Sequence, residues 1–100
     1  MKAIFDLLKR IQLDYGVYIG SKSIHKLATF LSGYECALSD ICKIKPSFNS
    51  AFQRFIEMKE SYKGSEHWSD ILIKGSSEDL AFDRFFMLLD EFQNQYEQET

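Results

Sequence analysis

The sequence predicts an all-α fold: one compact domain of about five helices that covers residues 1–100. Long segments carry apolar residues at helical spacing. One proline and five glycines leave few positions for the tight turns of a many-stranded sandwich or barrel. Hydrophobic residues make up 45% of the chain and include nine Phe, five Tyr and one Trp. That content is sufficient for one core without metal or disulfide support.

The first predicted helix spans Lys2–Leu13. One face has the i, i+3, i+4, i+7 spacing: Ile4, Leu7, Leu8 and Ile11. A corner with the sequence DYGVYIGSKS follows. It lacks the GxGxxG spacing, the GK[ST] ending and the preceding strand of a phosphate loop. We therefore interpret Gly16 and Gly20 as turn residues with backbone angles that a side chain would forbid, while Tyr18 and Ile19 close the end of the core.

The second predicted helix runs from Ile24 to Asp40 or Ile41. Ser21 and Ser23 are both candidate N-caps, because a serine hydroxyl can accept a hydrogen bond from a free amide of the first turn. The expected inward face consists of Ile24, Leu27, Ala28, Leu31, Tyr34, Leu38 and Ile41.

The third predicted helix begins after the loop KIKPSFNS, at a capping box formed by Ser50 and Gln53. It is expected to reach about Tyr62. Its inward residues are Phe52, Phe55 and Ile56, with Lys59 and Tyr62 as further candidates.

The fourth element, residues 66–74, is predicted as a short helix opened by Ser65, with a strand as the alternative because DILIKG is too short to decide. It holds Trp68, Ile71 and Leu72. The fifth helix is expected from the cap Ser76, with Asp79 in the capping-box position, to about Gln95. Its predicted buried stripe is Phe82, Phe85, Phe86, Leu89, Phe92 and Tyr96.

Charge is unevenly distributed along the chain. Residues 1–50 carry seven Lys and Arg against four Asp and Glu, a net +3, whereas residues 51–100 carry five against eleven, a net −6. A nucleic-acid-binding protein usually presents a basic field, so we expect no direct contact with nucleic acid. An acidic surface suits a basic partner protein instead.

The last predicted helix concentrates this negative charge. Four acids fall within a narrow sector beside the Phe stripe, without a Lys or Arg among them: Asp79, Asp83, Asp90 and Glu97. Unpaired like charges on one helix face each destabilise by a few tenths of a kcal/mol, which a cationic partner would offset. We therefore predict that these acids bind a partner, together with Tyr18 and Trp68, for which burial in the core is the alternative.

No arrangement of residues predicts catalysis. His25 and His67 lack the further ligands that a zinc site requires, although Asp70 follows His67 at helical spacing. Neither cysteine nor any serine has a recognisable base beside it. We expect a protein that is not an enzyme and has no catalytic residues, metal or cofactor.

Cys36 and Cys42 are expected to be free thiols, because a disulfide at that spacing would distort a helix, and free thiols indicate a reducing compartment. The opening MKAIFDLLKR lacks the apolar run and cleavage site of a signal peptide. No segment approaches the length of a membrane span. A cytoplasmic location without membrane association is expected.

Four stretches carry a family resemblance: YIGSKSIHKLATFLSGYECAL, FQRFIEMKESY, SEHWSDIL and EDLAFDRFFMLLDEF. In this order, from Leu7 to about Phe92, the chain resembles small all-helical bacterial immunity proteins of toxin–immunity systems. Members have a YxG-S-x-L corner, an FLxGY helix, a W-x-x-I-L segment and a closing A-F-x-x-F-F-x-L-L-x-E-F helix. The chain departs at Tyr15, Gly16 and Val17, where members often have Pro-Gly-Met, so its turn is expected to be less rigid.

The resemblance implies a protein that binds and neutralises a cognate secreted or contact-delivered toxin. The acids suit a nuclease, because a nuclease needs a cationic cleft for phosphates that an inhibitor can fill with carboxylates. Two alternatives stay open: a helical adaptor or oligomerisation module with an apolar interface, and a small enzyme or ligand-binding protein built around the corner. The sequence does not determine the toxin or the oligomeric state.

Overall fold

The computed structural model describes residues 1–99, and these residues form helices and loops without a strand. The helices within this range are α1 (Lys2–Leu13), α2 (Tyr15–Tyr18), α3 (Ile24–Asp40), α4 (Phe48–Lys59), α5 (Trp68–Ile73) and α6 (Glu78–Glu99). The all-α prediction is confirmed. The additional helix is α2, a single turn within the glycine corner.

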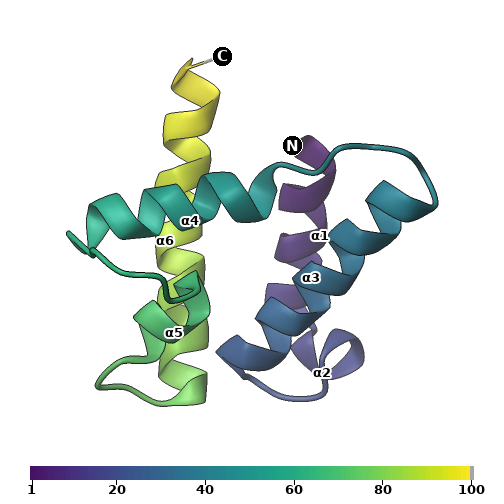
Figure 1. Ribbon diagram of the computed structural model, residues 1–100. Coiled ribbons are helices and arrows are strands. Elements are labelled where there is room, and N and C mark those ends of the chain that lie inside the picture. The colour runs from purple at the N-terminus through teal and green to yellow at the C-terminus, as the bar shows by residue number, and fades with distance from the viewer. Residues whose placement is uncertain (100) are drawn as a thin grey trace.

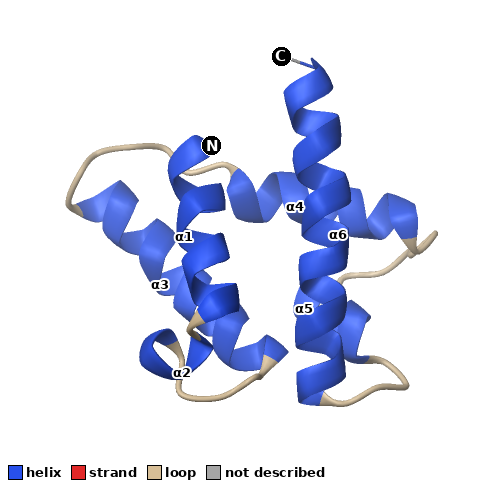
Figure 2. Ribbon diagram, turned by 180° about the vertical axis from the view of Figure 1, so that it is seen from behind, coloured by secondary structure: helices blue, strands red, loops and turns tan. Residues whose placement is uncertain are grey.

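The helices lie in two layers. Seen from behind, α1 stands in front of α3, and α6 stands in front of α4 and α5 (Figure 2). The helix α4 crosses α6, while α5 lies beside the first half of α6 (Figure 1). The long last helix therefore has one face against the rest of the fold and one face turned away from it.

An aromatic cluster fills the space between the layers. Phe52 of α4 lies at its centre, with ring centroids 5.1–5.4 Å from those of four other rings: Phe48, Trp68, Phe85 and Phe92. The predicted stripe of the last helix is buried from Phe82 to Phe92, and Tyr96 is half-buried. Each aromatic side chain can bury on the order of 150–250 Å², so this cluster supplies much of the apolar burial.

Trp68 attaches α5 to α4. Its side chain is fully buried, and its indole N–H donates to Oδ1 of Asn49 at 3.0 Å. Its backbone N–H donates to Oε1 of Gln53 at 2.7 Å, and Nε2 of Gln53 donates to the carbonyl of Glu66 at 2.9 Å. The strand alternative for this segment is wrong. Trp68 as a partner contact is also wrong, because the folded chain encloses it.

The helix α4 begins at Phe48, and the predicted capping box does not form. The Ser50 hydroxyl donates to a carbonyl of the preceding turn, while Gln53 is engaged with α5. Instead, Glu35 of α3 accepts hydrogen bonds from the backbone N–H and the side-chain amide of Asn49, at 3.2 and 3.0 Å. A carboxylate near a helix N-terminus is favoured by the helix dipole, so a neighbouring helix supplies the cap.

Two further helix starts differ from prediction. The N-cap of α5 is His67, whose Nδ1 accepts from the backbone N–H of Ser69 at 3.2 Å, so Ser65 is not the cap. The helix α6 begins at Glu78, which places the predicted cap Ser76 one residue too early. Its end also lies beyond the predicted Gln95, at Glu99.

Two predicted inward residues face solvent. Ile41 follows the last residue of α3 and is 78% exposed. Lys59 is exposed and forms an ion pair with Glu91 at 2.7 Å. Both lie at helix ends, where the chain leaves the core and the helical period no longer governs burial. The other inward residues predicted for α3 and α4 are buried or half-buried.

The glycine corner turns the chain as expected, although one of its glycines is not needed for this. Gly20 has φ +88, a conformation that favours glycine, whereas Gly16 lies within α2 without a positive φ. Tyr18 and Ile19 are half-buried against the core. Ser23 is the N-cap of α3 and accepts from the Lys26 N–H at 3.2 Å.

Asn49→Ala should lower the free energy of unfolding by about 1–3 kcal/mol, because it leaves the buried indole N–H of Trp68 without an acceptor. Urea denaturation measures this loss. The matched control is Asn94→Ala on the exposed face of α6, which should stay within about 0.5 kcal/mol of the parent. Equal losses for the two variants would contradict the role of Asn49.

Candidate functional site

The outer face of α6 carries the four predicted acids. We use the name acid ridge for Asp79, Asp83, Asp90 and Glu97, all of which are exposed. The Phe stripe of the same helix is buried against α4 and α5, so packing of the stripe turns the ridge toward solvent.

One member of the acid ridge has a counter-charge within the chain. Nζ of Lys22 lies 2.9 Å from Oδ2 of Asp83, with the two side chains 32% and 57% exposed. The hydrogen bond that Lys22 donates to Asp83 raises the pKa of Lys22. The lysine also lies 6.0 Å from the centroid of the Phe82 ring. The expectation of a wholly unpaired ridge is therefore wrong at Asp83.

The other acids of the ridge differ in their hydrogen-bond partners. The Ser77 hydroxyl donates to Asp79 at 2.6 Å, and this bond together with the Leu80 N–H lowers the pKa of Asp79. Glu97 accepts from Nε2 of Gln93 at 3.1 Å. Asp90 has no ion-pair partner within the described part of the chain. The ridge thus retains a net negative charge after the Lys22 pair is counted.

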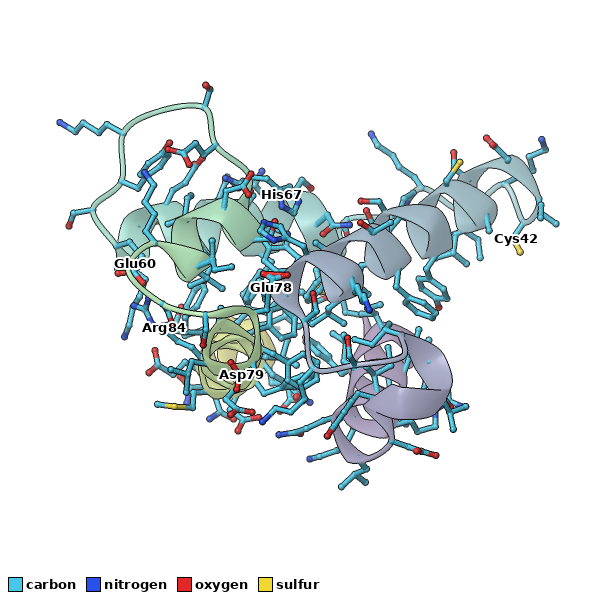
Figure 3. All side chains as sticks on the ribbon, turned by 90° about the horizontal axis from the view of Figure 1, so that it is seen from below. Cys42, Glu60, His67, Glu78, Asp79 and Arg84 are labelled. Carbon is cyan, nitrogen blue, oxygen red and sulfur yellow. The ribbon has the colours of Figure 1, made fainter. Side chains whose placement is uncertain are left out.

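The opposite edge of α6 is neutralised by α4. Arg84 forms an ion pair with Glu60 at the end of α4 (Figure 3), and Lys59 pairs with Glu91. These pairs connect two packed helices and leave that edge without excess charge. Negative charge on α6 is therefore concentrated on the ridge side.

Two exposed apolar side chains lie between these edges. Leu80 and Met87 are 60% and 70% exposed and stand seven residues apart, on one face of the helix. Neither residue was predicted as a partner contact, although the position of Met87 beside the acids follows from helical spacing. Met is enriched at protein–protein interfaces, so the outer face of α6 offers apolar contacts beside its carboxylates.

Tyr18 lies elsewhere on the surface. It lines a shallow depression at the start of α3, and its ring packs edge-on against Phe30 at 6.3 Å. His25 and Lys26 line the same depression. Of the six predicted contact residues, the structure brings the four acids together, places Tyr18 beside α3 and encloses Trp68 in the core.

A polar cluster around His25 was also missed. Nε2 of His25 lies 2.7 Å from Oδ1 of Asp70 on α5, and Nδ1 lies 2.9 Å from Oε2 of Glu78 on α6. The Ser23 hydroxyl donates to the second oxygen of Glu78 at 2.6 Å. Figure 3 shows Glu78 turned toward the start of α3. These partners lie 45 and 53 residues from His25 in sequence, beyond the reach of any local spacing rule.

The surroundings shift the pKa values of this cluster. The hydrogen bond to Asp70 and the charge of Glu78 raise the pKa of His25. For Glu78, partial burial acts upward, but the hydrogen bond from Ser23 and the charge of His25 together lower its pKa. Because both ring nitrogens of His25 are engaged by carboxylates, neither is placed to activate a nucleophile.

Within residues 1–98, side chains of His, Cys, Asp and Glu form no group of three that could hold a metal ion. None of the described helices has the length and apolar character needed to cross a membrane. Comparisons of the chain with protein-family models, curated proteins and solved structures find no match. Fold and surface together define a small all-helical protein with an acidic outer helix face.

The ion pair of Lys22 and Asp83 should contribute less than about 1 kcal/mol to stability, because both side chains are accessible to water. A double-mutant cycle of Lys22→Gln and Asp83→Asn, followed by urea denaturation, measures the coupling energy. A coupling well above that value would make Asp83 a structural residue.

Proposed function

We propose that this protein binds a basic partner protein through the outer face of α6 and blocks it without catalysing a reaction. The observation that carries the proposal is the acid ridge itself. Asp79, Asp83 and Asp90 are exposed on one side of one helix, and Lys22 supplies a single counter-charge at Asp83. A surface of this kind is electrostatically complementary to a cationic cleft.

The specific form of the proposal is an immunity protein that neutralises a cognate nuclease toxin in the cytoplasm. Its support is the family resemblance together with the sign of the charge. A nuclease must hold the phosphate backbone in a cationic cleft, and carboxylates on a rigid helix can occupy that cleft. Neutralisation then occurs by steric and electrostatic occlusion, with fast capture at low ionic strength.

Leu80 and Met87 favour a second candidate, a helical adaptor or oligomerisation module with an apolar interface. In the inhibitor proposal they instead supply the apolar contacts in the middle of an interface of standard size, roughly 1,600 Å² in total. The salt dependence of the association rate distinguishes the two functions. Association driven by the ridge slows steeply as salt rises, whereas association through Leu80 and Met87 does not.

Reversing the ridge charge should abolish binding. The double variant Asp83→Lys/Asp90→Lys is expected to weaken binding to the cognate toxin by at least about 100-fold, and to remove protection against that toxin in a growth assay. The matched control is Asp40→Lys, at the far end of α3, which should bind as the parent does. Stopped-flow association over a range of salt concentrations measures the effect.

Two results would reject the ridge as the binding surface. One is undiminished binding by the reversed variant. The other is loss of binding in Leu80→Ser/Met87→Ser with salt-independent association by the parent, which would establish the apolar interface.

Removing Lys22 should have the opposite effect to charge reversal. Lys22→Gln takes away the positive charge that pairs with Asp83, so the association rate constant at low salt should rise up to several-fold. The same stopped-flow assay measures it, and a slower association would show that Lys22 contacts the partner instead of weakening the ridge.

A further inference from the structure

The segment that opens α3 is joined to α5 and α6 by polar contacts. Lys22 pairs with Asp83, the Ser23 hydroxyl donates to Glu78, and His25 lies between Glu78 and Asp70. We use the name histidine clamp for His25 with its two carboxylates. This clamp connects three helices, α3, α5 and α6.

We propose that His25 is a pH-sensitive clamp, which as an imidazolium fastens α5 and the first turn of α6 to α3 and loosens when it loses its proton. This inference goes beyond the proposed function and does not depend on any partner.

The geometry requires the protonated ring. Both nitrogens point at carboxylate oxygens, at 2.7 and 2.9 Å, distances of charge-assisted hydrogen bonds. An imidazolium donates from both nitrogens, but a neutral imidazole has one donor and one acceptor. In the neutral ring, one carboxylate would therefore face a lone pair, and one of the two bonds would be lost.

The charged groups around His25 agree with this assignment. Asp70 comes from α5 and Glu78 from α6. A protonated His67, the N-cap of α5, would repel the His25 imidazolium. Burial lowers the pKa of His67 and so favours the neutral form of that ring. On α3, the Lys26 ammonium is directed to the Ser21 hydroxyl at 2.9 Å. Two carboxylates thus face one imidazolium.

The direction of the pH effect follows from the raised pKa of His25. An unperturbed histidine titrates near 6.5, so the clamp contributes its full stability below that pH. The contribution is lost as the pH rises through the pKa of the folded state. The lowered pKa of His67 has the opposite effect, a loss of stability as the pH falls below about 6.5. The two histidines therefore act in separate pH windows.

The first test is a proton NMR titration of the His25 ring. In His67→Asn, His25 is the remaining histidine of the chain, and Asn is itself a favourable N-cap. The pKa of His25 should lie above 6.5 and should fall in Asp70→Asn. A pKa at or below 6.5 would overturn the proposal, and so would a pKa that Asp70→Asn does not lower.

The second test is urea denaturation between pH 6.5 and 8.5. All proteins carry Cys36→Ser, because the hydrogen bond to Asp40 raises the pKa of the Cys36 thiol and would add its own pH dependence near the upper limit. The folding equilibrium constant of the parent should fall several-fold across this range, and that of His67→Asn should fall equally. In His25→Gln, whose side chain cannot be protonated, the folding equilibrium constant should not fall over this pH range. An unchanged pH slope in His25→Gln would overturn the proposal.

Discussion

The buried indole of Trp68 is the constraint on which the arrangement of the helices depends. A series of contacts through this indole connects four helices. Glu35 of α3 accepts a hydrogen bond from Asn49 of α4, and Asn49 accepts one from the indole N–H of Trp68 on α5. The indole also packs on Phe85 of α6, with ring centroids 5.0 Å apart. Apolar packing alone would permit each helix some rotation. The hydrogen bond from the buried indole N–H to Asn49 prevents this rotation, because a buried donor without an acceptor costs about 1–3 kcal/mol.

The orientation of the acid ridge is a consequence of this series of contacts. With Phe85 held against Trp68 and Phe52, the opposite side of α6 must face solvent. The ridge can therefore carry repelling carboxylates, since each repulsion amounts to only a few tenths of a kcal/mol and the buried rings of the same helix contribute several times more. A stable core of this kind permits a surface that is not optimised for stability.

Helical spacing in the sequence predicted the features that depend only on neighbouring residues. The bounds of α1, the body of α3 and the Phe stripe of α6 follow from helical spacing, and so does the sector that holds the four acids. Apart from the misplaced helix ends, three of the failures share one physical cause, which is a contact between distant residues. Glu35 caps α4 from another helix, Gln53 serves α5 instead of a capping box, and Lys22 reaches Asp83 across 61 residues. Propensity and spacing describe a helix in isolation, whereas these contacts exist only after the helices have packed.

The glycine corner illustrates how such contacts change the interpretation of a motif. By sequence it is a turn, and Gly20 with its positive φ performs that turn. Its exit, however, delivers Lys22 and then His25 to the beginning of α6, where Glu78, Asp79 and Asp83 concentrate negative charge. These carboxylates interact favourably with the N-terminal end of the helix dipole, but they repel one another. Lys22 and the His25 imidazolium offset that repulsion. One of the two cations is a lysine and the other a histidine. The segment that carries them therefore has two effects: Lys22 reduces the net charge of the acid ridge, and His25 makes the attachment of the first turn of α6 to α3 dependent on pH.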